Sequence, residues 1–416
     1  MTRPADVATR QSALRATFAS PLYRGATVAL FLSGLGFSAA APQIALFLVN
    51  DLHVSLTTAG LYYLTNLTAP VAGYLVGARS DRSGRRLGLF RLCALAGFVG
   101  WMAIAFSTQA WMPFVISALV LAFAGAASSQ LFAAIHDDLQ ATEHASADGV
   151  ISIVRMALTA GWIIGPVLGS FLAAAFGPRV MLATTAIFTL AQILPLGFMR
   201  TARIDPAEPS TASTPLPGAE SEHVVKRSGF RILLPLLTFT GLYVLVYAGE
   251  PIKYGYLPIY MHDDLHLPAV ISGSVIGIQP LIELLLMPVA IVVARRIGIM
   301  RLMILGAAFG VGANICFALT GTAIGLFAGQ ILMGGVWGIF AGLGIIVAQR
   351  LLPGAVATAS AIFMSSTAVA SALGGLTGGI GVSFLGLPLV FLLPAVYGLL
   401  ATIGIAIMSR SRHAVV

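Results

Sequence analysis

Four charged side chains stand inside long apolar stretches of the sequence, and they are the first candidates for chemistry: Arg155, Glu250, Lys253 and Glu283. Charged side chains in the hydrocarbon of a membrane are costly and usually line a cavity or a transport path. Glu283 lies one helical turn after Gln279 in a run that is otherwise aliphatic. An isolated carboxyl there can bind a ligand or exchange a proton. We therefore expect Glu283, and Glu250 with it, to take part in proton coupling.

Each carboxyl also has a purely structural interpretation. Glu283 could stay protonated and bond to a neighbouring helix, and Glu250 could be neutralised by Lys253, three residues later. Tyr243, Tyr247, Glu250 and Tyr254 follow at steps of four, three and four, which places them on one helical face.

Such a face offers flat aromatic walls and hydrogen-bonding groups, the combination that a sugar ring requires. The alternative is that the tyrosines only pack helices together. The full set of predicted substrate-binding residues is Gln43, Asn66, Gln130, Arg155, Trp162, Tyr247, Glu250, Tyr254, Gln279, Glu283 and Trp337.

Twelve apolar stretches between Ala26 and Met408 must position these residues. A helix needs roughly 20 mostly apolar residues to cross a bilayer, because its backbone groups must be satisfied within the segment. With 58% hydrophobic and 9% charged residues, the chain is far from a soluble composition. The sequence predicts an all-α membrane protein of twelve transmembrane helices in two six-helix bundles, residues 1–199 and 230–416. A cytoplasmic linker, 200–229, rich in proline, serine and threonine, joins them.

The net charge of +8 marks sidedness rather than nucleic-acid binding. If the stretches alternate across the membrane, almost all basic residues fall on one side, and Arg179 stands alone on the other. Basic loops are retained in the cytoplasm, so both termini are expected there, in the bacterial inner membrane. The loop from His262 to Pro268 is then external.

A short basic motif follows the second stretch, with the sequence GARSDRSGRR. Its key residues are Gly77, Asp81, Arg82, Gly84, Arg85 and Arg86, and a weaker copy, VARRIGIMR, follows the eighth stretch. Two parallel repeats of six spans are typical of the major facilitator superfamily, whose loop signature this motif resembles. We expect a gating role for it, with Asp81 held by a basic partner; the alternative is that the arginines only fix topology.

A second motif lies in the fifth stretch, RMALTAGWIIGPVLGSFL. Gly161, Gly165 and Gly169 recur every four residues and form a smooth stripe for close helix packing, and Pro166 interrupts it. The stripe is similar to one found in exporters and antiporters of the superfamily.

Further segments resemble the bacterial sugar efflux transporters of that superfamily: APQIALFL, TNLTAPVAG, QLFA, VRMALTAGWIIGP, YLPIYMHDDLHLP and AQRLLPG. The resemblance covers both halves. It implies that Asn66, Gln130, Arg155, Trp162 and Glu283 serve the cavity or its coupling. The chain departs from that family in two places. It has His136, Asp137 and Asp138 where a more basic stretch is expected, and Lys253 in a region where an acidic residue is expected. These departures leave the identity of the sugar open.

The sequence thus predicts an exporter of sugars or sugar-like solutes, working by alternating access in exchange for protons, without cofactor or metal and as a monomer. The alternative is a proton-coupled multidrug exporter with the same frame. A receptor or scaffold would need a folded output domain, which the short tails do not provide. Neither a phosphate-binding glycine loop nor a nucleophile motif occurs in a solvent-facing context, so we expect neither an enzyme nor an ATP-driven pump.

Overall fold

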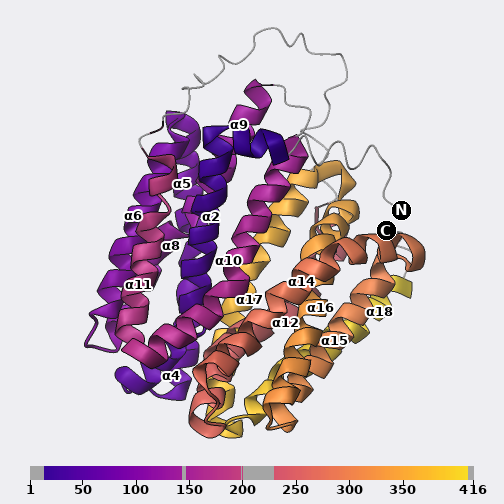
Figure 1. The fold of residues 1–416 in the computed structure, drawn as a ribbon. Helices are drawn as coiled ribbons and strands as arrows, with labels where there is room; N and C mark the ends of the chain where they lie inside the picture. The colour runs from indigo at the N-terminus through magenta and orange to yellow at the C-terminus, as the bar shows by residue number, and fades with distance from the viewer. Residues whose placement is uncertain (1–13, 143–146, 198, 200–228, 411–416) are drawn as a thin grey trace.

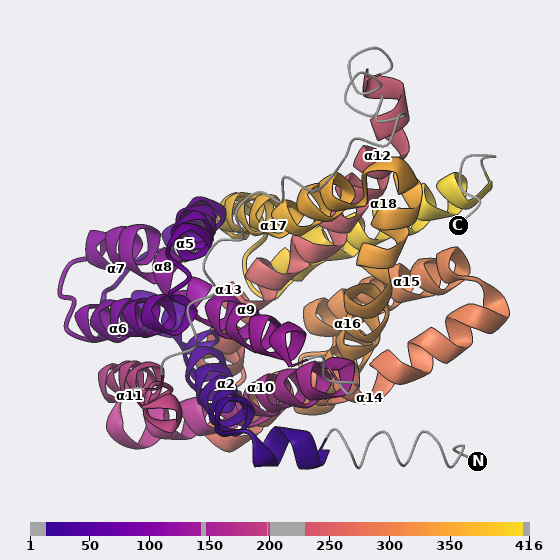
Figure 2. The ribbon, with the colours of Figure 1, turned by 90° about the horizontal axis from the view of Figure 1, so that it is seen from above.

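A computed structural model describes residues 14–142, 147–197, 199 and 229–410 of the chain. Within these ranges the secondary structure is helical, with no strand. The helices form two bundles that stand side by side (Figure 1 and, from above, Figure 2). The helical part of the predicted fold is therefore confirmed.

The first bundle is built from residues before 200. Its elements are α2 (Pro21–Ala40), α3 (Gln43–Leu46), η1 (Phe47–Asp51), α4 (Leu56–Leu61), η2 (Tyr62–Thr68), α5 (Ala69–Ser83), α6 (Arg86–Ala105), α7 (Trp111–Ile116), η3 (Ser117–Leu121), α8 (Ala122–Ala124), α9 (Ala126–Ala141), α10 (Ala147–Phe176), α11 (Pro178–Ala191) and η4 (Leu194–Leu196). Two clusters of buried side chains form its core, one near each end of the helices.

The second bundle begins at Gly229. Its elements are α12 (Gly229–Tyr247), α13 (Gly249–Ile259), η6 (Tyr260–Asp264), α14 (Ala269–Ile297), α15 (Ile299–Leu319), α16 (Ala323–Leu351), η7 (Pro353–Ala355), α17 (Val356–Leu385), η8 (Leu389–Phe391) and α18 (Leu392–Arg410). One large buried cluster forms its core. The predicted linker, 200–229, lies outside the described residues except for Gly229, so the exact division between domains stays a prediction.

Eleven helical segments in the described ranges are long and apolar enough to cross a membrane. The twelfth predicted span corresponds to α4, η2 and α5, which run without a gap from Leu56 to Ser83. It is less apolar because it carries several threonines and Asn66. Its first part, α4 and η2, packs against α17 of the other bundle. Twelve helices therefore agree with the prediction.

Two prolines break the spans that lead to the central region. Pro42 separates α2 from α3. Pro251 has no N–H to donate to the carbonyl of Tyr247, and α12 ends at that residue while α13 begins at Gly249. The predicted single face from Tyr243 to Tyr254 is therefore wrong in one respect, because the helix is interrupted at Ala248.

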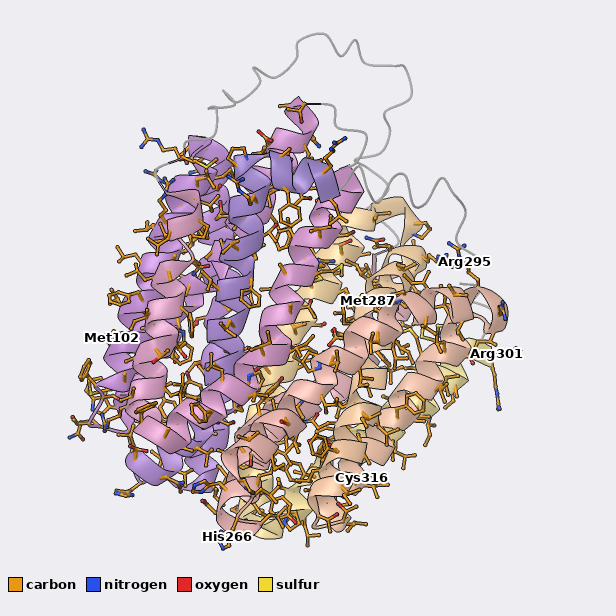
Figure 3. All side chains as sticks on the ribbon, viewed as in Figure 1. Met102, His266, Met287, Arg295, Arg301 and Cys316 are labelled. Atoms are coloured by element: carbon orange, nitrogen blue, oxygen red, sulfur yellow. The ribbon has the colours of Figure 1, made fainter. Side chains whose placement is uncertain are left out.

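The two ends of the bundles differ in what they carry. We call the end where α2 begins and α18 terminates the termini face; Arg295 and Arg301 lie there, and His266 lies at the opposite face (Figure 3). Near the opposite face the bundles meet along two seams, α10 with α14 and α4 with α17. Toward the termini face α10 and α14 diverge (Figure 1).

Glycines allow the close approach at both seams. A methyl group added at Gly277 of α14 would lie 2.7 Å from the carbonyl oxygen of Ile163 in α10. One added at Gly379 of α17 would lie 2.8 Å from the carbonyl oxygen of Thr57 in α4. Side chains at these positions would push the two halves apart near the opposite face.

Candidate functional site

A cavity of about 450 Å³ lies between the bundles, on the termini side of the α10–α14 seam. Helices of both halves line it: α10 from the first bundle, and α12, α13, α14 and α16 from the second. Its lining residues are Arg155, Leu158, Thr159, Trp162, Tyr247, Glu250, Tyr254, Gln279, Pro280, Glu283, Met287, Trp337 and Ala341. We call it the central cavity.

Eight of the eleven predicted binding residues line the central cavity. They are Arg155, Trp162, Tyr247, Glu250, Tyr254, Gln279, Glu283 and Trp337. These residues are spread over 183 positions of sequence, from Arg155 to Trp337, and only the packing of two bundles brings them together. Whether they bind a solute stays a prediction.

Lys253 does not line the central cavity, but it is fully buried and bonds to two residues that do, Glu250 and Gln279. Its Nζ lies 2.8 Å from each carboxylate oxygen of Glu250, and it also donates to Oε1 of Gln279. The indole Nε1 of Trp337 donates to Oε1 of Glu250 at 2.7 Å. A buried charge requires such pairing because its removal from water is otherwise too costly. Glu250 is therefore a compensated carboxylate, as the structural alternative supposed.

Glu283 and Arg155 differ from Glu250 in their side-chain contacts. Among the described residues, neither makes an ion pair or a hydrogen bond through its side chain, although both line the cavity. Glu283 lies in α14, one turn beyond Gln279, and Arg155 lies across the cavity in α10. The cavity thus holds one committed carboxylate and one that is available to a ligand or a proton.

Three predicted binding residues lie outside the central cavity. Gln43 donates to the hydroxyl of Ser170 at 2.9 Å, in a separate pocket near the opposite face. Asn66 donates to the hydroxyl of Ser371 at 2.8 Å and so joins the two halves. Gln130 is buried in the first bundle, and its Oε1 has no partner among the described groups.

A second cavity, of about 470 Å³, adjoins the central one and shares Tyr247 with it. Asn66, Ser365, Thr367 and Ser371 contribute amide and hydroxyl groups to its wall. The second cavity therefore lies between η2, α5 and α17, on the far side of Tyr247 from Glu283.

Sequence reasoning placed two residues differently from the structure. Tyr243, the first residue of the predicted aromatic face, is buried against Phe363, with ring centroids 4.5 Å apart, and does not line the cavity. The sequence predicts Lys253 as a neutralising partner of Glu250, and in the structure it also bonds to Gln279 of the next helix. The spacing of Glu250 and Lys253, three residues apart on a helix, was the available signal.

The basic motif after α5 forms an ion-pair network inside the first bundle. Arg86 lies 2.6 Å from Asp81 and 3.0 Å from Asp137, at the end of α9, and also donates to Ser80. Asp81 thus has the basic partner that the sequence predicts. Gly84 ends α5 with a φ of +63°, a conformation that favours glycine. Arg82 and Arg85 are exposed, and Gly77 has no close neighbour beyond its own helix.

The glycine stripe of α10 packs against α2 within the first bundle. A methyl group at Gly161 would lie 2.5 Å from the carbonyl oxygen of Phe31, and one at Gly165 would lie 2.6 Å from that of Leu35. Gly169 lies against Ala39 in the same way. Pro166 has a different neighbour: its carbonyl faces Gly273 of α14. The stripe therefore fixes α10 within its own half, and the proline lies at the seam with the other.

A family comparison agrees with this architecture. The model of the Major Facilitator Superfamily matches residues 26–359. The chain belongs to this superfamily. It is therefore a multi-pass membrane transporter and not an enzyme, as the sequence predicts.

Curated relatives cover most of the chain. Sugar efflux transporter A of Dickeya chrysanthemi is 27% identical over 355 residues, 85% of this chain and 87% of its own. Sugar efflux transporter A of Escherichia coli strain K12 is 28% identical over 371 residues, 86% and 88% of the two chains. Multidrug resistance protein MdtG of Proteus mirabilis is 27% identical over 318 residues, 74% and 75%.

The fold agrees with solved transporters. The crystal structure of the nucleoside transporter NupG superposes with a TM-score of 0.77 at 17% identity, over 94% of this chain and 100% of that one. At such low identity the match shows the fold alone. It supports the predicted arrangement of two bundles around a central cavity.

Proposed function

We propose that this transporter exports a sugar or sugar-like solute by alternating access, in exchange for protons. The similarity to proteins named sugar efflux transporters, over more than four fifths of the chain, supports the solute class. The observation that carries the proposal is the content of the central cavity, where aromatic rings from both halves and two carboxyls from the second half face one space.

The cavity has the chemistry that a polyol requires. Trp162, Tyr247 and Trp337 offer flat apolar faces for the C–H face of a sugar ring. Gln279 and Glu283 offer amide and carboxyl groups for its hydroxyls. Its volume of about 450 Å³ lies within the usual range for small-molecule sites, roughly 300 to 1,000 Å³.

Glu283 is the best candidate for proton exchange. Glu250 already bonds to Lys253 and Trp337, so a proton on Glu250 would remove the negative charge that pairs with the buried Lys253. Glu283 has no such partner among the described groups and can gain or lose a proton as the cavity opens. We therefore assign the coupling role to Glu283 and a fixed structural charge to Glu250.

Transport follows from the way in which the halves meet. The seams near the opposite face are closed, and the cavity lies on the side of the termini face. By the distribution of basic residues, the termini face is cytoplasmic, so the cavity loads from inside the cell. Rocking of the halves, 1–199 and 230–416, about the central site would then open the opposite face. We place the protein, as a monomer, in the bacterial inner membrane.

Efflux from proteoliposomes tests the proposal. Purified protein is reconstituted with a panel of labelled mono- and disaccharides inside, and release is followed with and without an imposed pH gradient. We expect release of at least one sugar, faster when protons can flow inward. Release that matches empty liposomes for every sugar would reject the solute class, and release indifferent to the gradient would reject the antiport.

A second candidate is a proton-coupled multidrug exporter. The similarity to MdtG, named a multidrug resistance protein, favours it, and so does an available carboxyl beside aromatic rings, which also suits a lipophilic cation. Thermal-shift screening separates the two: stabilisation by sugars supports the first, and stabilisation only by lipophilic cations supports the second.

A further inference from the structure

The packing register of α10 against α14 places two unpaired charges level with each other. The helices are antiparallel at the seam: Ile163 faces Gly277, and four residues further along α10, Val167 faces Gly273. A step along one helix therefore matches an equal step back along the other. Both helices continue as single elements toward the termini face, so the same register predicts which residues become level if the two helices close there.

Arg155 and Glu283 lie on this extension. Arg155 lies eight residues from Ile163 in the direction of the termini face. Eight residues from Gly277 in the same direction is Leu285, which lies two residues beyond Glu283. Two residues of helix correspond to a rise of about 3 Å. An arginine side chain spans that difference easily. Both side chains line the central cavity, so they lie on the same side of the seam.

Neither charge is satisfied in this conformation. Arg155 is exposed, and among the described residues neither side chain has an ion-pair partner. Lys253 cannot serve Glu283, since its three N–H groups already have three acceptors, on Glu250 and Gln279. Bringing α10 and α14 together on the termini side would remove water from both groups and leave them only each other.

We propose that Arg155 and Glu283 form an ion pair between the two halves when the termini face closes, and that this pair holds the closed state. The inference rests on the proposed alternating-access function and deepens it. It gives Arg155 the role of a positioning residue, which acts through Glu283 on the conformation rather than on the solute alone.

The pair also accounts for exchange of solute against protons. A deprotonated Glu283 attracts Arg155 and favours closure of the termini face with solute inside. A proton that reaches Glu283 from the opposite face removes its charge, breaks the pair and favours return to the conformation described here. The other ionisable groups around Glu283 are Glu250 and Lys253, which stay paired with each other, and Tyr243, Tyr247 and Tyr254.

Distance measurements across the termini face test the pair. Cys93 and Cys316 are replaced by alanine, and spin labels are placed at Gln140 and Arg295, exposed ends of α9 and α14. Pulsed electron paramagnetic resonance in lipid nanodiscs, without solute, then measures the distances between the two labels and so the populations in which the termini face is open or closed. We expect a short-distance population that grows as pH rises. Arg155→Gln and Glu283→Gln should each lower it at least about threefold.

Charge exchange separates an ion pair from general damage. The double variant Arg155→Glu/Glu283→Arg should recover the short-distance population. Arg301→Gln, which removes an exposed arginine at the same face, should leave it unchanged. The proposal would be overturned if the single variants had the same short-distance population as the spin-labelled protein in which Arg155 and Glu283 are intact. It would also be overturned if that protein showed only the long distance at every pH.

A second measurement covers the case in which the exchanged variant does not fold. Cysteines at Arg155 and Glu283 should join through a short thiol cross-linker more efficiently than cysteines at Arg155 and Gln279, which lie further apart in register. Equal yields would reject the register argument. Both tests work without a solute, so an incorrect sugar assignment would leave them intact.

Discussion

Trp337 and Lys253 both donate hydrogen bonds to the carboxylate of Glu250. The indole nitrogen of Trp337 lies 2.7 Å from Oε1 of Glu250, and Nζ of Lys253 lies 2.8 Å from each of its oxygens. Lys253 is fully buried. The ion pair of Lys253 and Glu250 therefore belongs to the structural framework around the cavity.

Removing one partner of this buried pair should be costly. Lys253→Met leaves the Glu250 carboxylate buried without its cation, and we expect a loss of about 3–5 kcal/mol in stability. The measurement is the melting temperature in detergent. The double variant Lys253→Met/Glu250→Gln removes both charges and should recover most of the loss. A single variant as stable as the parent would show that the pair has no structural role.

Glu283→Gln should separate binding from coupling. The amide keeps hydrogen-bonding capacity and volume but cannot exchange a proton, so solute binding should change little while the effect of a pH gradient on efflux disappears. Efflux from proteoliposomes with and without the gradient measures this. Asp264→Asn, an exposed carboxylate at the opposite face, is the matched control and should retain the gradient effect. Unchanged pH dependence in Glu283→Gln would exclude the coupling role.

Gly165→Ala should destabilise the first bundle. The added methyl would lie 2.6 Å from the carbonyl oxygen of Leu35 and would also collide with Ser38, so α10 and α2 must separate. Overpacking of this kind costs typically about 1–3 kcal/mol. Gly241→Ala in α12, where no heavy atom lies within 4 Å, should cost nothing. Equal melting temperatures for the two variants would contradict the packing argument.

Asp81→Asn tests the gating role of the basic motif. Its side chain is 70% exposed, and Arg86 keeps Asp137 as a partner, so the loss of stability should stay below about 1 kcal/mol. If the motif gates transport, turnover should nevertheless fall. Melting temperature and initial efflux rate are compared in the same preparation. Turnover equal to the parent would leave Asp81 with no role beyond its contact with Arg86.

Membrane orientation can be checked with single cysteines in a background without Cys93 and Cys316. Arg296 is exposed and directly follows Arg295, which lies at the termini face, and His266 is exposed at the opposite face (Figure 3). A membrane-impermeant maleimide on intact cells should label His266→Cys and spare Arg296→Cys, and permeabilised cells should give both. The reverse labelling would invert the proposed direction of transport.

Hydropathy alone determined the helical class and the twelve spans, because a backbone in lipid must bond within its own segment. The charges in those spans were equally visible, since a lone carboxyl among aliphatic residues stands out in any sequence. These features are local, and local chemistry fixes them.

The tertiary structure decided which of these residues share one space. It united Arg155 and Glu283 around the central cavity but placed Gln43, Asn66 and Gln130 elsewhere. It also distinguished two carboxyls that look equivalent in the sequence, because Lys253 pairs with Glu250 and leaves Glu283 available to a ligand or a proton. The rotation of each helix about its axis and the register of α10 against α14 depend on glycine contacts between distant segments, and no single segment of the sequence contains that information.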